Sequence, residues 1–180
     1  MDSILKSLIK AKSKDICVEV YIQERSGILV GKVQNVSEKY LLLESISPQG
    51  MNDGFILISI DEIYCVDLDT NYSRKIYKLY NLKSQKHDLV PLTEDNNFID
   101  LLRFSKENNL IMEFDYFNYE ENLSDQGFVI DIDDLCVSFR TIDNFGKVNG
   151  SKILKLENIK RLYCDGYHVR DLKLLYDLDF

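Results

Sequence analysis

Two stretches of the sequence, GKVQNVSEKYLLLESISPQGMNDG at residues 31–54 and GFVIDIDDLCVSFRTIDNFGKVNG at residues 127–150, correspond to one another at a distance of 96 residues. The first, twentieth and last residue of each stretch are glycines, and no gap is needed between them. The correspondence continues without a gap to residue 82, whereas upstream the distance becomes 94 residues, so the second copy carries two extra residues before Gly127. Three glycines kept in register indicate an internal duplication.

Both copies predict the same order of secondary structure. Apolar residues with helical spacing begin each copy, and alternating residues at 16–22 and 110–116 predict a half-buried strand. The quoted stretches predict two further strands and a Gly-rich loop, followed by a fourth strand, a short turn, a fifth strand and a helix. The polar stretch 83–95 contains a proline and predicts a linker. We therefore expect a mainly β protein with flanking helices (α+β) and two repeats, at 1–82 and 96–180.

The glycine at the start of each quoted stretch predicts how the strands are arranged. Five short strands have edges that need protection, and a small curved barrel protects them. Gly31 and Gly127 lie inside the second strand, where a glycine allows a sharp bend. We therefore expect two tandem five-stranded small barrels, each preceded by an α-helix.

Composition excludes several classes of protein. The chain has 180 residues, of which 45% are hydrophobic, and only 2 Pro and 8 Gly, which excludes collagen-like and Pro/Gly-rich disordered chains. Its apolar runs are too short to cross a bilayer, so we expect no membrane association. Four cysteines without a CxxC pair indicate reduced thiols, which predicts a cytoplasmic protein.

Charge is unevenly distributed between the two copies. The net charge is −8, which argues against a general binder of nucleic acid. Residues 1–82 hold 10 basic and 11 acidic side chains, whereas residues 93–180 hold 10 and 18. Two readings of the acidic second copy stay open: it keeps the protein in solution, or it meets a basic partner.

The order of these elements resembles that of the Sm-like family, which has an N-terminal helix, a bent five-stranded sheet and a one-turn connection into the last strand. In the first copy the resemblance is carried by VEVYI at 18–22, Gly31, VQNVSEKYLLLE at 33–44 and ILISIDEIYCV at 56–66. In the second copy it is carried by MEFDYF at 112–117, Gly127, VIDIDDLCVSF at 129–139 and ILKLENIKRL at 153–162. Residues 47–67 are also similar to uncharacterised bacterial proteins, which implies a bacterial or phage source and no function.

The resemblance implies a place for RNA. Sm-like proteins bind uridine- or adenine-rich RNA inside a ring, and the positions that match their site here are Asp133, Lys155 and Asn158. The family's base-contacting asparagine is replaced by Leu41 and Val137, whose side chains cannot form a hydrogen bond with a base. We therefore do not expect RNA binding of the family's kind, and an RNA binder with a degenerate site stays as the alternative.

Catalytic and metal sites are not expected. The two histidines, His87 and His168, suggest no Ser-His-Asp or Cys-His arrangement. Cys164 and His168 supply two ligands, whereas a zinc site needs about four. The acidic stretch 131–134 lacks the Gly-containing pattern of a calcium loop. We expect no enzyme activity, no metal and no cofactor.

Aromatic side chains crowd the first strand of the second copy and the loop after it, at Phe114, Tyr116, Phe117 and Tyr119. Alternate strand residues face opposite ways, so some of these side chains point outward, where Tyr and Phe often anchor contacts. Packing within the fold is the other reading. The sequence predicts a non-catalytic protein-interaction or regulatory module with a protein partner, and a homo-oligomer stays open.

Overall fold

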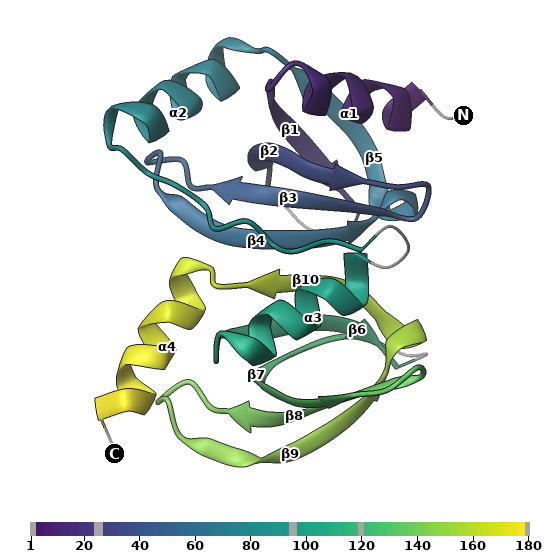
Figure 1. The fold of residues 1–180 in the computed structure, drawn as a ribbon, viewed down its shortest axis with the longest axis vertical. Coiled ribbons are helices and arrows are strands. Elements are labelled where there is room, and N and C mark those ends of the chain that lie inside the picture. The colour runs from purple at the N-terminus through teal and green to yellow at the C-terminus, as the bar shows by residue number, and fades with distance from the viewer. Residues whose placement is uncertain (1–2, 24–26, 94–96, 119–120, 179–180) are drawn as a thin grey trace. The chain divides into compact units, whose positions relative to one another are not determined.

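The computed structural model describes residues 3–23, 27–93, 97–118 and 121–178. Contacts divide the chain into two compact units, unit 1 (Met1–Leu89) and unit 2 (Val90–Phe180). Over the described residues there are ten strands, four α-helices and two 3₁₀ turns. Figure 1 labels the helices and strands along the ribbon. The protein is therefore mainly β with flanking helices, as the sequence predicts.

Unit 1 follows the predicted order of elements. It contains α1 (Ser3–Ser13), β1 (Cys17–Ile22), β2 (Leu29–Val36), β3 (Tyr40–Ile46), β4 (Asn52–Ser59), the 3₁₀ turn η1 (Ile60–Glu62), β5 (Ile63–Leu68) and α2 (Asn71–Leu82). The hydroxyl of Thr70 accepts a hydrogen bond from the backbone N–H of Ser73, which caps the N-terminus of α2.

Unit 2 repeats this order. It contains α3 (Asn97–Glu107), β6 (Ile111–Phe117), β7 (Asn122–Ile132), β8 (Cys136–Ile142), β9 (Val148–Lys155), η2 (Leu156–Asn158), β10 (Ile159–Cys164) and α4 (Tyr167–Leu178). Among the described residues, no helix is long and apolar enough to cross a membrane.

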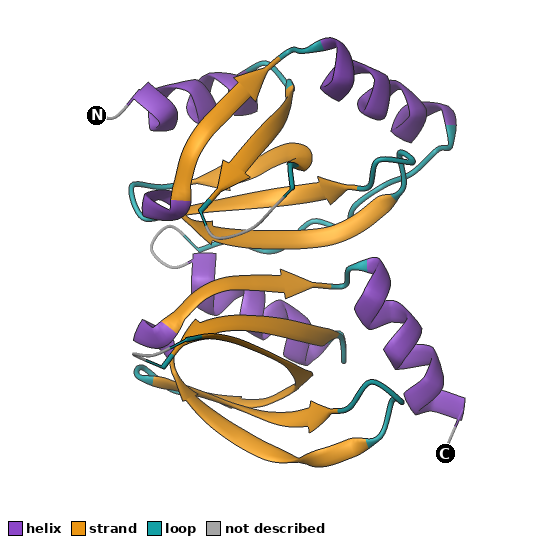
Figure 2. Cartoon of the chain, turned by 180° about the vertical axis from the view of Figure 1, so that it is seen from behind, coloured by secondary structure: helices purple, strands orange, loops and turns teal. Residues whose placement is uncertain are grey.

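The strands of each unit form a curved antiparallel sheet (Figure 2). The order is β5-β1-β2-β3-β4 in unit 1 and β10-β6-β7-β8-β9 in unit 2. In the described part of each unit, no ladder joins the fourth strand to the fifth, so the sheet is open and the expected barrel closure is not confirmed. The reason is that the chain crosses from β4 through η1 and then pairs with β1, where Val18 lies opposite Leu68, instead of forming a hairpin with β4.

The glycine of the second strand is required by the close approach of the third strand. A Cβ atom on Gly31 would lie 2.2 Å from the backbone oxygen of Glu44, and one on Gly127 would lie 2.0 Å from that of Arg140. Both second strands also change register just after the glycine, between Val33 and Asn35 in unit 1. At the position where the sequence predicts a bend, the second and third strands therefore approach each other too closely for a side chain on the second strand.

Residues with a positive φ angle recur in the two units at a distance of 96 residues. Asp69 and Asp165 precede the last helix of their units and have φ values of 58° and 57°. Each carboxylate pairs with an arginine of that helix, Arg74 at 2.6 Å and Arg170 at 2.9 Å. The two copies therefore agree in backbone conformation and in side-chain partners as well as in element order.

A hydrophobic core in each unit joins the last helix to the first three strands. Its buried members are Cys17, Val30, Ile46, Ile76 and Tyr80 in unit 1, and Ile111, Phe128, Ile142, Val169 and Leu172 in unit 2.

Candidate functional site

The residues that the Sm-like resemblance assigns to RNA lie at one end of unit 2. Asp133 belongs to the turn between β7 and β8, whereas Lys155 ends β9 and Asn158 ends η2. The backbone N–H of Leu156 donates to the carbonyl oxygen of Leu135 at 2.8 Å, which places the turn and η2 side by side. The structure therefore brings these elements together.

The side chains at this end are occupied with local contacts. The Asp133 carboxylate accepts hydrogen bonds from the backbone N–H groups of Leu135 and Cys136, at 2.8 and 2.7 Å, so it stabilises its own turn. Lys155 lies 3.3 Å from Glu157. Within the described residues, no hydrogen bond or ion pair joins Asp133, Lys155 and Asn158 to one another.

The positions of the family's base-reading asparagine lie in the core. Leu41 and Val137 are both completely buried. A side chain at either position faces apolar neighbours, so these positions present nothing to a base.

The aromatic residues expected as contact anchors have three different environments. Phe114 is completely buried and stacks on Phe139 with ring centroids 4.2 Å apart, so it belongs to the core and cannot be a surface contact. Phe117 is 37% exposed, with the Lys160 ammonium 5.1 Å above its ring. Tyr119 lies outside the described residues. Tyr116 is nearly buried and takes part in a polar cluster.

This polar cluster joins three strands of unit 2. The Tyr116 hydroxyl of β6 donates to the Asp125 carboxylate of β7 at 2.5 Å, and the Lys152 ammonium of β9 donates to both. The equivalent positions of unit 1 hold Ile22, Leu29 and Ile56. That exchange of three apolar residues for polar ones is the sequence signal that could have revealed the cluster.

The protonation of the cluster suits a structural role. Burial raises the pKa of Tyr116, and its hydrogen bond to Asp125 adds to this effect. Burial lowers the pKa of Lys152, but its hydrogen bonds to Asp125 and Tyr116 outweigh this and raise it overall. Near neutral pH the phenol keeps its proton and the amine stays charged, so neither group is poised as a base or nucleophile.

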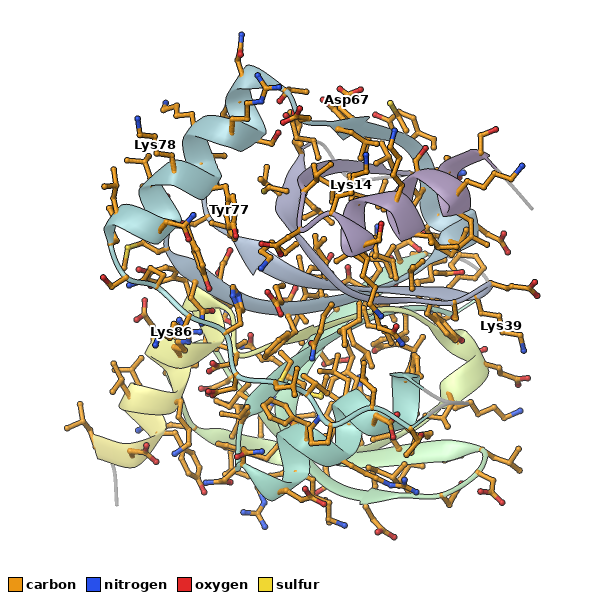
Figure 3. All side chains as sticks on the ribbon, turned by 45° about the horizontal axis from the view of Figure 1, so that its top comes forward. Lys14, Lys39, Asp67, Tyr77, Lys78 and Lys86 are labelled. Atoms are coloured by element: carbon orange, nitrogen blue, oxygen red, sulfur yellow. The ribbon has the colours of Figure 1, made fainter. Side chains whose placement is uncertain are left out.

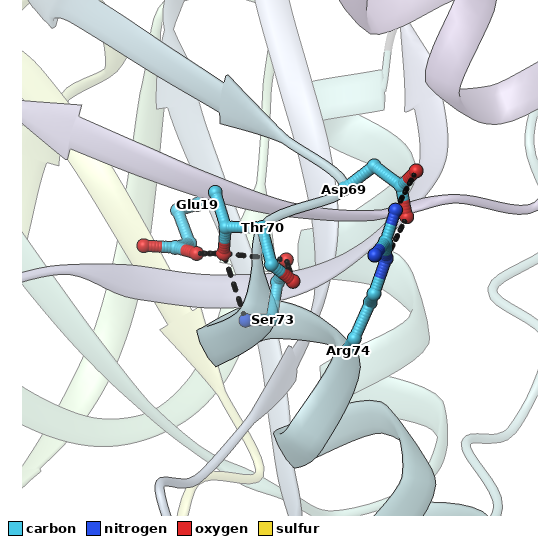
Figure 4. A network of polar contacts seen from close by, with 5 residues as sticks. All are labelled: Glu19, Asp69, Thr70, Ser73 and Arg74. Carbon is cyan, nitrogen blue, oxygen red and sulfur yellow. Dashed lines mark hydrogen bonds and ion pairs between the residues drawn. The ribbon is translucent and has the colours of Figure 1, made fainter.

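A second polar network surrounds the N-terminus of α2 (Figure 4). The carboxylate of Glu19, which is 4% exposed, accepts a hydrogen bond from the Thr70 hydroxyl. The Thr70 hydroxyl also accepts from the backbone N–H of Ser73 at 3.1 Å. Because the Ser73 side chain is completely buried, no substrate can reach it, and the network serves as a helix cap.

Metal ligands do not cluster. In the part of the chain that the structure describes, no group of three or more His, Cys, Asp or Glu side chains could hold a metal ion. His168 contacts the Gln126 amide oxygen at 3.1 Å, and His87 lies near Tyr80 of unit 1. Cys164 is completely buried.

A shallow depression of about 420 Å³ lies beside α2. It is lined by Arg74, Tyr77, Lys78, Asn81 and Leu82, all from that helix; Figure 3 labels Tyr77 and Lys78. The lining includes no carboxylate, thiol or imidazole.

Large apolar side chains are exposed on unit 2. Five of them are between 63% and 80% exposed: Leu135, Phe145, Ile153, Leu174 and Leu178. The equivalent positions of unit 1 hold Lys39, Gln49, Leu57, Lys78 and Leu82, of which Leu57 is buried. The exposure of these residues was not predicted, and its signal in the sequence is the exchange of lysine and glutamine in the first copy for leucine and phenylalanine in the second.

Comparison with known proteins assigns the chain to no family. No protein-family model matches it, and a search of curated proteins found no match.

Proposed function

We propose that this protein is a non-catalytic protein-interaction module built from two Sm-like repeats. The observation that carries the proposal is the set of five exposed apolar side chains on unit 2. Single exposed apolar residues are common on any protein, but three of these five, Leu135, Phe145 and Leu174, replace polar residues of the sister copy, which favours a role in contacts. Four of the five have an equivalent in unit 1 that is polar or buried.

The charge of the second copy favours a partner with basic groups. Residues 93–180 hold 18 acidic and 10 basic side chains. A surface of one charge attracts a partner of the opposite charge and raises the rate of their association. An apolar contact within an acidic unit therefore suits a protein that presents apolar side chains beside lysine or arginine.

RNA binding, the alternative, has less support. Lys155 already pairs with Glu157, and the positions of the base-reading asparagine are buried leucine and valine. The net charge of −8 also repels the phosphate backbone. We keep RNA as an outcome that the experiment can detect.

The test is affinity capture from a lysate of the native host, using the full chain and five single variants. These are Leu135→Ser, Phe145→Ser, Ile153→Ser and Leu178→Ser in unit 2, with Leu82→Ser, 71% exposed, as the matched control in unit 1. We expect one protein to be retained by the wild type and the control and to fall at least about tenfold with one or more unit 2 variants. Retention of RNA in place of a protein, or equal retention by all five variants, would refute the proposal.

A further inference from the structure

In unit 1, residues 83–89 leave α2 and run back along β4 (Figure 1; Lys86 is labelled in Figure 3). We call this segment the strap. The ring of His87 holds it at two points, because Nε2 lies 2.9 Å from the carbonyl oxygen of Ser45 in β3 and Nδ1 lies 2.8 Å from the hydroxyl of Tyr80 in α2. This histidine therefore joins the strap to a strand and to a helix of unit 1.

The strap also contacts the start of β4. The backbone N–H of Asn52 donates to the side-chain oxygen of Gln85 at 3.1 Å, and the Asn52 amide donates to the carbonyl oxygen of Lys86. These contacts depend on the position of the strap, so the exchange of the Asn52 backbone N–H with solvent reports whether the strap is in place.

The two contacts of His87 determine where its neutral ring carries the proton. A carbonyl oxygen can only accept, so Nε2–H donates to Ser45, and Nδ1 accepts from the Tyr80 hydroxyl. Tyr80 is 6% exposed, and among the described residues its hydroxyl has no other acceptor. The neutral ring therefore satisfies the carbonyl, the hydroxyl and its own N–H at once.

A second proton on the His87 ring reverses the contact with Tyr80. Nδ1–H becomes a donor, and the Tyr80 hydroxyl must turn its proton away from its acceptor. The Tyr80 ring, stacked on His87 with centroids 5.6 Å apart, attracts the charged imidazole, but a buried donor without a partner costs more than such an attraction contributes. Phe55 meets the imidazole at 5.4 Å and accepts no conventional hydrogen bond. The charged ring therefore fits this place less well than the neutral one.

Charged side chains of both signs come from the elements around His87. They are Lys32 on β2, Glu44 on β3, Asp53 on β4, and Lys86 and Asp88 on the strap. All are exposed or half-buried, so water screens them and the two direct hydrogen bonds decide which form of the ring fits. From α2, Tyr77 stacks on Tyr80 and stays uncharged because burial raises its pKa. Burial also raises the pKa of Glu44 toward the range in which histidine titrates, so this carboxyl needs its own control.

We propose that protonation of His87 releases the strap from unit 1 between pH 7.5 and 5.5. Histidine is the side chain that ordinarily changes its charge in this range, and the chain has only two. The neutral ring holds residues 83–89 against α2 and β3, and the charged ring frees them. Because unit 2 begins at Val90, release lengthens the free connection between the two units. The fold thus contains an acid-sensitive latch on the segment that joins its two copies.

Hydrogen exchange of the full chain, followed by mass spectrometry at pH 7.5 and 5.5, tests the proposal. Protection is expressed relative to the exchange rate of an unfolded chain at the same pH, which removes the intrinsic effect of pH. We expect the peptides that contain the strap and Asn52 to lose protection at least about fivefold at pH 5.5, as for the loss of about one hydrogen bond. The ladder between β2 and β3, where Val33 lies opposite Leu43, should keep its protection within about twofold.

Three variants identify the group that titrates. A glutamine has a donor and an acceptor but does not change its charge, so His87→Gln should show equal protection of the strap at both pH values. Glu44→Gln removes the other carboxyl in question, and His168→Gln removes the other histidine, which is exposed on α4. Both control variants should lose protection of the strap as the wild type does.

The proposal is refuted if the strap of the wild type is equally protected at both pH values, or if His87→Gln loses protection as the wild type does. A loss that Glu44→Gln or His168→Gln abolishes would assign the effect to that residue and refute the latch. An equal loss in the ladder between β2 and β3 would show that unit 1 unfolds as a whole, and this too would refute it.

Discussion

Replacing Gly31 by alanine introduces one methyl group at the closest approach between β2 and β3. The new Cβ would lie 2.2 Å from the backbone oxygen of Glu44 and 2.8 Å from Cγ of Leu43, where ordinary van der Waals contact begins at 3.4 Å. The obstacle is backbone, which cannot turn away as a side chain can. At least one strand must therefore move by about an ångström.

The magnitude follows from two opposing effects. Overpacking of a tight interior costs about 1–3 kcal/mol, and Leu43 beside the new methyl group is completely buried, so the strand cannot relax toward solvent. Alanine also has less freedom than glycine in the unfolded chain, which returns about 0.4–1 kcal/mol. We expect a net loss of about 1–2 kcal/mol, and the same loss for Gly127→Ala, whose Cβ would lie 2.0 Å from the backbone oxygen of Arg140.

Urea unfolding followed by far-ultraviolet circular dichroism measures these losses. The control is Ser151→Ala, because Ser151 is an exposed residue of β9 and the change removes a hydroxyl without adding an atom. The control should change the free energy of unfolding by less than about 0.5 kcal/mol. An unchanged value for both Gly31→Ala and Gly127→Ala, or an equal loss in the control, would refute the close-approach explanation.

Iodoacetamide at pH 8 should alkylate the half-buried Cys65 at least about 100-fold faster than Cys164, because Cys164 is completely buried and its burial raises the pKa of its thiol. Peptide mapping measures the two rates, and equal rates would refute this expectation. Burial raises the pKa of Cys17 from 9.0 to about 12 and that of Tyr80 from 10.0 to about 12. The protonated forms of these two groups therefore contribute stability that is complete below pH 9 and is lost as the pH rises toward 12. The urea concentration at the unfolding midpoint should decrease when the pH is raised from 9 to 10.5, and an unchanged midpoint would contradict this. Short oligo-uridine should show no micromolar binding by fluorescence anisotropy at moderate salt, whereas binding that Lys155→Ala abolishes would restore the RNA alternative.

The order of elements could be predicted because its signals are local or repeated. Alternating residues define a strand over six or seven positions, and the distance of 96 residues carries each assignment from one copy to the other. Gly31 also indicated how the strands are arranged, because a glycine inside a strand usually marks a bulge, a tight bend or the close approach of another backbone. Barrel closure depends on whether the fifth strand pairs with the fourth as well as with the first, and residue type does not specify which strands it pairs with.

The polar contacts were harder to predict because they join residues distant in the sequence. Residues 83–89 have the composition of a linker, yet His87 and Gln85 fix them to unit 1 through hydrogen bonds to residues more than thirty positions away. Tyr116 was predicted as a contact residue from its type alone, whereas its hydroxyl is held by Asp125 and Lys152 from two other strands. Hydrogen bonding between strands depends on register, which residue type does not specify.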